Sequence, residues 1–433
     1  MDDAVPDGGE DGAGLRWLFL DLNAYFASVE QQMNPDWRGK PVIVRPAPSE
    51  HTGAIAASYE SRPFGVRTGM RVSEARALCP GLIVADARPD LYVRVHHRIM
   101  AVLDRHAPIF KVGSIDEASC ELTRGQRRVD QAVPLARAIQ AAIRKEVGDC
   151  LHSSVGLAPS RFLAKTACGM HKPDGLTVLR ADALPGPLLG LPLSKYPGVG
   201  PRMVKRLAAA GITDTAGLWA LDARRARTLW GSVEGERIWR GLRGLDSDTP
   251  PPKPIASISH SHVLASAMRT PEGARAVARR LIVKCGARLR RLGLTGGSLG
   301  LHIDLGEPRK HDGWSTGSFN VATPPTSDTF VLLAALETLW RRAAPELRGA
   351  RPGYVGVSIH ALKPIGEALP DLFDPGPDQG GASRSLRLSQ ALDVLNRRFG
   401  KDTVSIGPRP DLPAYIGAKI AFNRIPELDE FCE

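Results

Sequence analysis

The chain has 433 residues, of which 43% are hydrophobic and 24% are charged. That length leaves room for about three domains with buried cores, and the composition excludes wholesale disorder. No apolar run approaches the roughly 18 residues that span a bilayer. The first fourteen residues hold five acids and no base, unlike a signal peptide. The sequence therefore predicts a cytoplasmic protein with no membrane partner.

The net charge of +11 is unevenly distributed along the chain. Without the acidic arm of residues 1–14, which we expect to be disordered, 57 basic side chains face 41 acidic ones, a surplus of +16. Such a surplus favours a polyanionic partner, most often nucleic acid. A surplus of basic side chains that serves only solubility would give the same net charge. The six cysteines show no CxxC spacing, so we predict neither a zinc site nor a disulfide framework.

Strand-like and helical stretches alternate over residues 15–185, as in a mixed α/β or α+β domain. The patterns predict elements in this order: a strand at 17–22, a helix at 24–33, strands at 41–44 and 54–59, a helix at 91–106 and an extended run over 109–122. A compact helical stretch around a glycine-rich hinge follows within residues 186–246.

A proline-rich linker at residues 247–255 separates this first part from the rest, because consecutive prolines favour a stiff, extended spacer. Residues 256–366 mix strand and helix patterns, which is typical of a small α+β domain. The tail, residues 367–433, begins with a Gly/Pro/Asp-rich break and contains one helical run over 386–400.

Three acidic side chains are candidate metal ligands. Asp21 ends an apolar strand, and Asn23 can cap the helix that follows. Asp116 and Glu117 are adjacent in an apolar extended run, where a straight strand would bury one of them. A hairpin tip or bend there would bring both to one site. With Asp21 they would suit two Mg²⁺ ions in phosphoryl or nucleotidyl transfer, whereas each alone fits an ordinary turn.

Other residues suit a triphosphate. Tyr59 and Arg62 are three positions apart, so they share a face of a helical turn. Arginine offers a bidentate fork to phosphate oxygens, and tyrosine adds a hydroxyl donor. Lys172 precedes a Pro-Asp-Gly turn, from which an ammonium group can reach into a site.

Five motifs in this order resemble the Y-family translesion DNA polymerases, in particular the bacterial polymerase IV and polymerase V catalytic subunits. They are FLDLNAYFASVE, SYESRPFGVRTGM, SIDEA, SSVGLAPSRFLAKTACGMHKPDG and YPGVGPRMVKRL, and the likeness covers about residues 15–365. The resemblance implies a right-hand fold. Its parts would be a catalytic palm with small fingers (15–185), a helix-hairpin-helix thumb (186–246) and an α+β little finger (256–366).

The resemblance also implies roles for single residues. It makes Asp21, Asp116 and Glu117 the catalytic carboxylates, which bind two Mg²⁺ ions together with the backbone of Leu22. Phe26 would be the steric gate that crowds a ribose 2′-hydroxyl, although a core phenylalanine fits its pattern too. The nucleotide contacts it implies are Tyr25, Phe26, Tyr59, Arg62 and Lys172. One departure is Asn23, which stands where many relatives have a second aspartate that is not a metal ligand.

Two regions are predicted to bind DNA. In the hinge, Gly198 and Gly200 allow a close approach to a phosphate, and Lys205 follows on the next helix. Residues 256–363 hold 15 basic and 7 acidic side chains. There Arg280, Lys284 and Arg288 follow one helical face. A basic face that is merely solvated would show the same pattern. If the face binds DNA, we expect that binding to depend steeply on salt concentration.

The tail contains Ala-Leu-Pro-Asp-Leu-Phe, which loosely resembles the sliding-clamp peptide of bacterial members without its leading glutamine. Leu369, Leu372 and Phe373 would then contact the clamp as an extended segment.

These features predict an error-prone, template-directed DNA polymerase that adds dNTPs to a primer on template DNA, bypasses lesions, and acts at the nucleoid. An alternative is a catalytically silent DNA-binding adaptor in mutagenic repair, and the three acids argue against it. Another is a palm-type nucleotide cyclase, which would not need a basic grip on a duplex.

Overall fold

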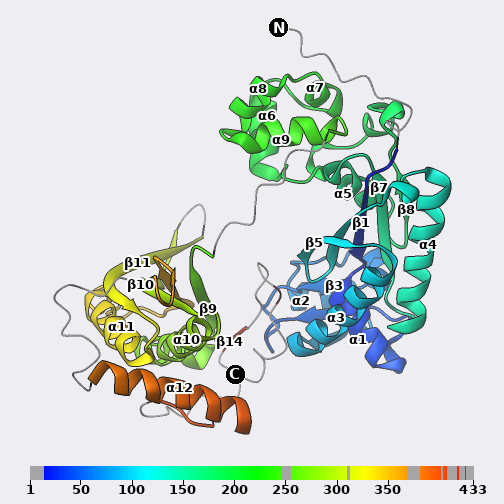
Figure 1. The fold of residues 1–433 in the computed structure, drawn as a ribbon. Coiled ribbons are helices and arrows are strands. Elements are labelled where there is room, and N and C mark those ends of the chain that lie inside the picture. Colours follow the sequence, from blue (N-terminus) through cyan, green and yellow to red (C-terminus); the bar gives the residue numbers. More distant parts are fainter. Residues whose placement is uncertain are drawn as a thin grey trace. The chain divides into compact units, whose positions relative to one another are not determined.

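The computed structural model describes residues 14–245, 255–309, 313–367, 381–400, 403–406, 417–418 and 425, and Figure 1 shows its ribbon. The chain forms two compact units, which divide between residues 249 and 250. This division falls within the predicted linker 247–255, of which only residue 255 is described. The acidic arm also lies outside the described residues except for Gly14.

A five-stranded sheet forms the centre of the first unit, with β1 in its middle (Figure 1). In spatial order its strands are β5 (Ile109–Ser114), β6 (Glu117–Glu121), β1 (Trp17–Leu22), β7 (Ser153–Ala158) and β8 (Leu176–Val178). β1 runs antiparallel to both of its neighbours, and β8 runs parallel to β7. The strand predicted at 17–22 and the extended run over 109–122 are thus confirmed.

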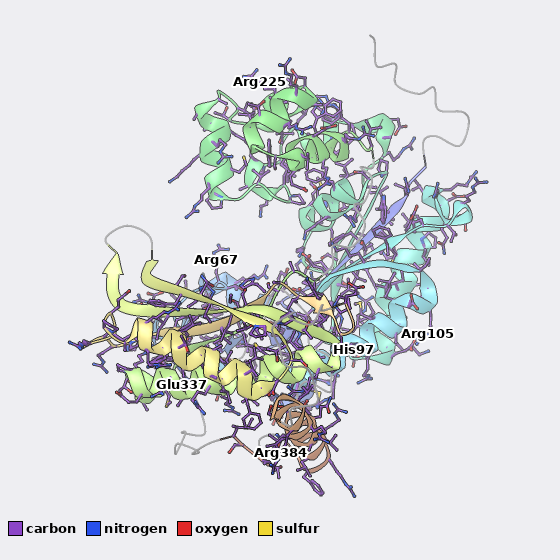
Figure 2. The ribbon with its side chains drawn as sticks, turned by 60° about the vertical axis from the view of Figure 1, so that its left-hand side comes forward. Arg67, His97, Arg105, Arg225, Glu337 and Arg384 are labelled. Carbon is purple, nitrogen blue, oxygen red and sulfur yellow. The ribbon has the colours of Figure 1, made fainter. Side chains whose placement is uncertain are left out.

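The two faces of this sheet pack against different helices. Leu18 and Leu20 of β1 lie in a core with α3 (Pro89–His106) and α4 (Val129–Glu146). The alternate residues Trp17 and Phe19 lie in a second core with α5 (Arg161–Met170). Since side chains alternate along a strand, Asp21 continues the α5 side of β1. Arg105 of α3 forms an ion pair with Glu146 at the end of α4 (Figure 2).

A smaller sheet in the first unit has the order β3 (Ala56–Ala57), β2 (Val42–Arg45) and β4 (Ile83–Asp86). Around it lie α1 (Tyr25–Met33), α2 (Val72–Leu78) and the 3-10 helices η1 (Pro35–Trp37) and η2 (Tyr59–Phe64). The strand predicted at 54–59 is only two residues long, because the backbone turns into η2 directly after Ser58. η3 (Arg124–Gln126) precedes α4.

Residues 181–242 are helical, as predicted for the hinge region. They form η4 (Ala181–Ala183), η5 (Gly186–Leu188), η6 (Leu193–Lys195), α6 (Pro201–Ala209), α7 (Thr215–Trp219), α8 (Ala223–Trp230) and α9 (Val233–Leu242). The first helix of the predicted hairpin is only the single turn η6. Gly198 has a φ of 78°, a left-handed conformation that favours glycine, and Gly200 is the N-cap of α6.

The second unit is a six-stranded sheet with helices α10 (Pro271–Arg291) and α11 (Thr329–Ala343) on one face (Figure 1). Its strands are β11 (Gly313–Thr326), β10 (Leu294–Arg309), β12 (Tyr354–His360), β9 (Ile258–Leu264) and β14 (Gly417–Ala418), with β13 (Lys363–Pro364) beside β10. η7 (Ser266–Met268) precedes α10. Glu337 of α11 forms ion pairs with Arg275 and Arg279 of α10 (Figure 2).

The predicted tail helix is α12 (Gly381–Phe399), which begins five residues earlier than expected. Arg290 of α10 donates from Nε and Nη2 to the two carboxylate oxygens of Asp393 on α12, at 2.6 and 2.8 Å. The clamp residues Leu369, Leu372 and Phe373 lie outside the described residues. Within the described part of the chain, no helix is long and apolar enough to cross a membrane, and five cysteines are free thiols.

Candidate active site

Three carboxylates meet at one end of the central sheet. Asp21 lies on β1 directly opposite Glu117 of β6 in the strand register, so their side chains share a face of the sheet. Asp116 is in the two-residue tip between β5 and β6, and its carbonyl oxygen accepts a hydrogen bond from the Leu22 N–H at 2.8 Å. The predicted hairpin tip is confirmed, and it brings the acids at 116 and 117 to the end of β1.

Each carboxylate already has a polar partner. Lys172 donates to Asp21, Ser114 donates to Asp116 at 2.5 Å, and Lys165 donates to Glu117 at 2.7 Å. Among the described residues, no group of three or more His, Cys, Asp or Glu side chains is arranged to hold a metal ion as it stands. The donor chemistry fits Mg²⁺, which prefers carboxylate and carbonyl oxygens. Metal binding therefore requires these carboxylates to exchange partners.

The electrostatics of Asp21 agree with a cation-binding role. Its side chain is only 15% exposed, and burial raises its pKa from 3.8 to about 6 against the lowering effect of Lys172. Asp116 and Glu117 raise this pKa further, so the three carboxylates interact. A buried anion beside two other anions is stabilised by a positive charge.

The loop that carries Lys172 is held by a buried amide. The side-chain oxygen of Asn23 accepts from the Asp174 N–H at 2.8 Å, and its NH₂ group donates to Ser154 at 3.0 Å. Arg144 of α4 donates to both carboxylate oxygens of Asp174 at 2.9 Å. Asn23 is 2% exposed. The sequence reading of Asn23 as a helix cap is wrong, since Ala24 is the N-cap of α1 and makes no side-chain cap.

The predicted phosphate ligands Tyr59 and Arg62 share one face of η2. The guanidinium carbon of Arg62 lies 3.5 Å from the centroid of the Tyr59 ring, a stacked arrangement that orients the arginine. Burial opposes a charge on Lys172, but the nearby Asp21 carboxylate outweighs it and raises the Lys172 pKa, with a smaller contribution from Tyr59. Tyr59 is thus within electrostatic range of Lys172.

Phe26 is half-buried and stacks on Tyr92 of α3, with ring centroids 4.4 Å apart and planes inclined by 19°. The Tyr92 hydroxyl donates to the buried carboxylate of Glu30 at 2.8 Å, and Arg88 forms an ion pair with the same carboxylate. Tyr25 is 3% exposed and its hydroxyl donates to the Tyr92 carbonyl at 2.6 Å. Because the Tyr25 side chain is buried and hydrogen-bonded, only the Tyr25 backbone is left for the predicted nucleotide contact.

Two functional candidates were not predicted from the sequence. His96 of α3 is buried, and its Nδ1 lies 2.8 Å from the Ile115 carbonyl in the hairpin tip. Burial lowers its pKa to about 4, so neutral His96 donates to that carbonyl and holds the tip. The other is Lys165. It lies on α5, and no sequence signal showed that this helix faces Glu117.

The predicted DNA contacts fall in both units. In the first, Lys205 is exposed on α6, which begins at the turn formed by Gly198 and Gly200. In the second, Arg280, Lys284 and Arg288 are half-buried on α10, and each already interacts with other groups of the protein. Val277, Leu281 and Leu289 of the same helix are buried in the core.

The chain matches two models of the impB/mucB/samB family, the family model over residues 20–169 and its C-terminal domain over 255–372. A DNA polymerase IV of Moorella thermoacetica is 36% identical over 396 residues, which cover 89% of this chain and 94% of the relative. A DNA polymerase IV of Pelotomaculum thermopropionicum is 33% identical, with 89% and 93% covered.

Solved structures share the fold. The Y-family DNA polymerase chimera Dbh-Dpo4(243-245)-Dbh superposes with a TM-score of 0.67 at 23% identity, covering 81% of this chain and 99% of the chimera. An insertion ternary complex of Dbh DNA polymerase gives a TM-score of 0.55, also at 23% identity.

Proposed function

Because the chain belongs to the impB/mucB/samB family and is a template-directed translesion DNA polymerase of the Y family, we propose that Asp21, Asp116 and Glu117 are its catalytic carboxylates. The fold has the palm, fingers, thumb and little finger of these enzymes, and the protein binds DNA and a dNTP. The observation that carries the proposal is the meeting of the three acids at one end of β1.

Two Mg²⁺ ions would be held by these carboxylates and the Leu22 carbonyl. When bound, such ions activate the primer 3′-hydroxyl and offset charge on the triphosphate. The chain's own contribution is to orient the acids: the β1–β6 register aligns Asp21 with Glu117, and His96 and the Leu22 N–H hold the tip that carries Asp116.

Tyr59, Arg62 and Lys172 would bind the triphosphate of the incoming nucleotide. The stacking of Arg62 on Tyr59 orients its guanidinium fork for bidentate contact with phosphate oxygens. Lys172 has to leave Asp21 to reach a phosphate. Anchoring of its loop by Asn23 and Arg144 keeps the base of that side chain fixed while the ammonium moves.

Phe26 would be the steric gate that selects deoxynucleotides, with Tyr25 contributing its backbone. The stacked Tyr92 and the buried Glu30 behind it leave the Phe26 ring little freedom to withdraw from a ribose 2′-hydroxyl. The test is the Phe26→Ala variant, for which we expect higher ribonucleotide incorporation at similar dNTP incorporation. Unchanged dNTP/rNTP selectivity would remove this role.

For DNA, we propose that the turn at Gly198 and Gly200 and the side chain of Lys205 contact phosphates of the duplex. Arg280, Lys284 and Arg288 are the predicted contacts in the little finger. On sequence alone, Leu369, Leu372 and Phe373 are proposed to bind the sliding clamp. Acting on chromosomal DNA, the enzyme would work in the cytoplasm at the nucleoid.

Primer extension on undamaged and lesion-bearing templates tests the catalytic assignment. We expect wild type to extend both and Asp116→Ala to extend neither, while both proteins bind the primer–template equally. Asn396→Ala on the tail helix, distant in sequence from every proposed site residue, is the matched control. Robust extension by Asp116→Ala would refute the carboxylate assignment.

A further inference from the structure

We propose that Lys165 is a positioning residue that competes with a catalytic metal ion for the Glu117 carboxylate. The inference rests on the proposed function of Glu117 and adds a residue that no motif assigned. Its basis is an ion pair between Lys165 Nζ and Glu117 Oε2 at 2.7 Å, which uses an oxygen of a proposed metal ligand.

The backbone of Lys165 is held rigidly against the sheet. α5 packs so closely on β7 that a Cβ at Gly156 would lie 2.0 Å from the Ala164 carbonyl oxygen. Ser160 caps the helix by accepting from the Leu163 N–H, and its hydroxyl donates to the Gly241 carbonyl at 2.5 Å. The start of the Lys165 side chain is therefore fixed beside the acids.

The end of the Lys165 side chain is free to move by comparison. It is 41% exposed, while Glu117 is 21% exposed, and its ammonium lies 5.2 Å from the centroid of the Phe19 ring. A partly exposed ion pair changes an equilibrium constant by only a few-fold. A divalent cation binding to several oxygens can therefore displace the ammonium, so the pair is a reversible counter-ion contact.

Charge explains why such a contact is useful. Three carboxylates close together repel one another, and Lys165 and Lys172 supply two positive charges, one on Glu117 and one on Asp21. When cations take the carboxylates, both ammonium groups become available beside the bound nucleotide. Lys172 is then expected to bind a phosphate of the nucleotide, whereas Lys165 acts only through its contact with the Glu117 carboxylate.

Thermal unfolding with and without a divalent ion tests the competition. The proteins are full-length wild type, Lys165→Met, Lys165→Arg and the control Lys145→Met, an exposed lysine near the end of α4. In EDTA we expect Lys165→Met to melt about 2–4 °C below wild type, because Glu117 loses its counter-ion. In saturating Mg²⁺ the gap should close or reverse, while Lys165→Arg follows wild type. An equal loss of melting temperature in both buffers would assign Lys165 a merely structural role and overturn the proposal.

Calorimetric titration with Ca²⁺, in the absence of DNA, gives a second measurement. We expect Lys165→Met to bind about fivefold more tightly than wild type, and Lys145→Met to bind like wild type. Unchanged or weaker Ca²⁺ binding by Lys165→Met would also overturn the competition. The Asp116→Ala variant separates this outcome from the proposed function. If that variant binds Ca²⁺ as wild type does, the carboxylate assignment fails, whatever Lys165 does.

Discussion

The palm and the little finger both place two long helices on one face of a sheet, but the other faces differ in chemistry. In the palm, α3 and α4 cover one face, and the α5 side ends in the carboxylates of Asp21 and Glu117. In the little finger, α10 and α11 cover one face. The opposite face also carries Val263, Tyr354 and the buried Asp304. Most of its other residues have small or neutral polar side chains, and they include Ser259, Ser261, Ser298, Gly300, His302, Ser318, Asn320, Gly356, Ser358 and His360.

The difference shows how the same arrangement of helices on a sheet can present a surface for a cation in one region and for an anion in the other. Clustered carboxylates repel one another and bind cations. A face of small neutral side chains repels no phosphate and lets a nucleic-acid backbone approach the strands. Gly300 illustrates the crowding that keeps this face flat, since a Cβ there would lie 2.6 Å from the Ser358 hydroxyl and 2.8 Å from the Asn320 side-chain oxygen. This face is therefore a second candidate surface for DNA in the little finger, besides the proposed contacts Arg280, Lys284 and Arg288 of α10 on the helix-covered side.

The largest effect should follow from removing a palm charge. We expect Asp21→Asn to lower the rate of primer extension about a thousandfold or more, because a proposed ligand of the catalytic ions is lost. The DNA affinity measured by fluorescence anisotropy should stay at the wild-type value. A parallel loss of DNA affinity would show that the palm carboxylate also contributes to DNA binding, so that the two regions do not have separate roles.

The same substitution should change the pH dependence of stability. Burial raises the Asp21 pKa to about 6 in the folded protein, so the native state binds this proton more tightly than the unfolded chain does. The unfolding free energy therefore falls as pH rises from about 4 through 6, by at most about 3 kcal/mol. In urea titrations with EDTA, Asp21→Asn should lose this decline between pH 4 and 6. Curves that run parallel at all pH values would contradict it.

Titration of His96 changes the unfolding free energy in the opposite direction over the same pH range. Burial lowers its pKa to about 4, so its contribution to stability is complete above about pH 6.5 and is lost as pH falls toward 4. The difference between wild type and Asp21→Asn isolates the aspartate, because both proteins keep His96.

A charge placed on the little-finger sheet should weaken DNA binding. Ser261 is exposed on β9, and we expect Ser261→Asp to raise the Kd for primer–template about tenfold at low salt, with Ca²⁺ binding unchanged. Ser261→Asn is the matched control. If Arg280→Ala on α10 weakens DNA binding and Ser261→Asp does not, DNA binds on the helix-covered side of the little-finger sheet.

The smallest effect concerns a histidine on that sheet. Burial and then the neighbouring His360 lower the His302 pKa, so His302 gains its proton only below the usual histidine range. Protonation adds positive charge, and we expect DNA binding to tighten about two- to threefold when the pH is lowered from 7 to below the usual histidine range. His302→Asn should show less of this gain in anisotropy titrations at matched ionic strength. An equal gain in the variant would exclude His302 as its source.

Much of the catalytic region could be predicted from the sequence. The apolar run that ends at Asp21 has to be a buried strand, and two adjacent acids in an extended run require a bend, because a straight strand would bury one carboxylate. The prediction for Asn23 failed, since a helix cap and a buried amide that joins a strand to a loop have the same local sequence. The tail helix was placed five residues late because its polar beginning lacks an apolar face.

By itself, the sequence determined which side chains are chemically suited to bind a metal ion, a phosphate or a nucleic acid, because that chemistry is local to each side chain and its near neighbours. The tertiary structure decided which groups meet. Strand register sets Asp21 against Glu117, the packing of α5 brings Lys165 to the same carboxylate, and α3 delivers His96 to the hairpin tip. These contacts join positions 19 to 96 residues apart, and only the folded packing of strands and helices fixes them.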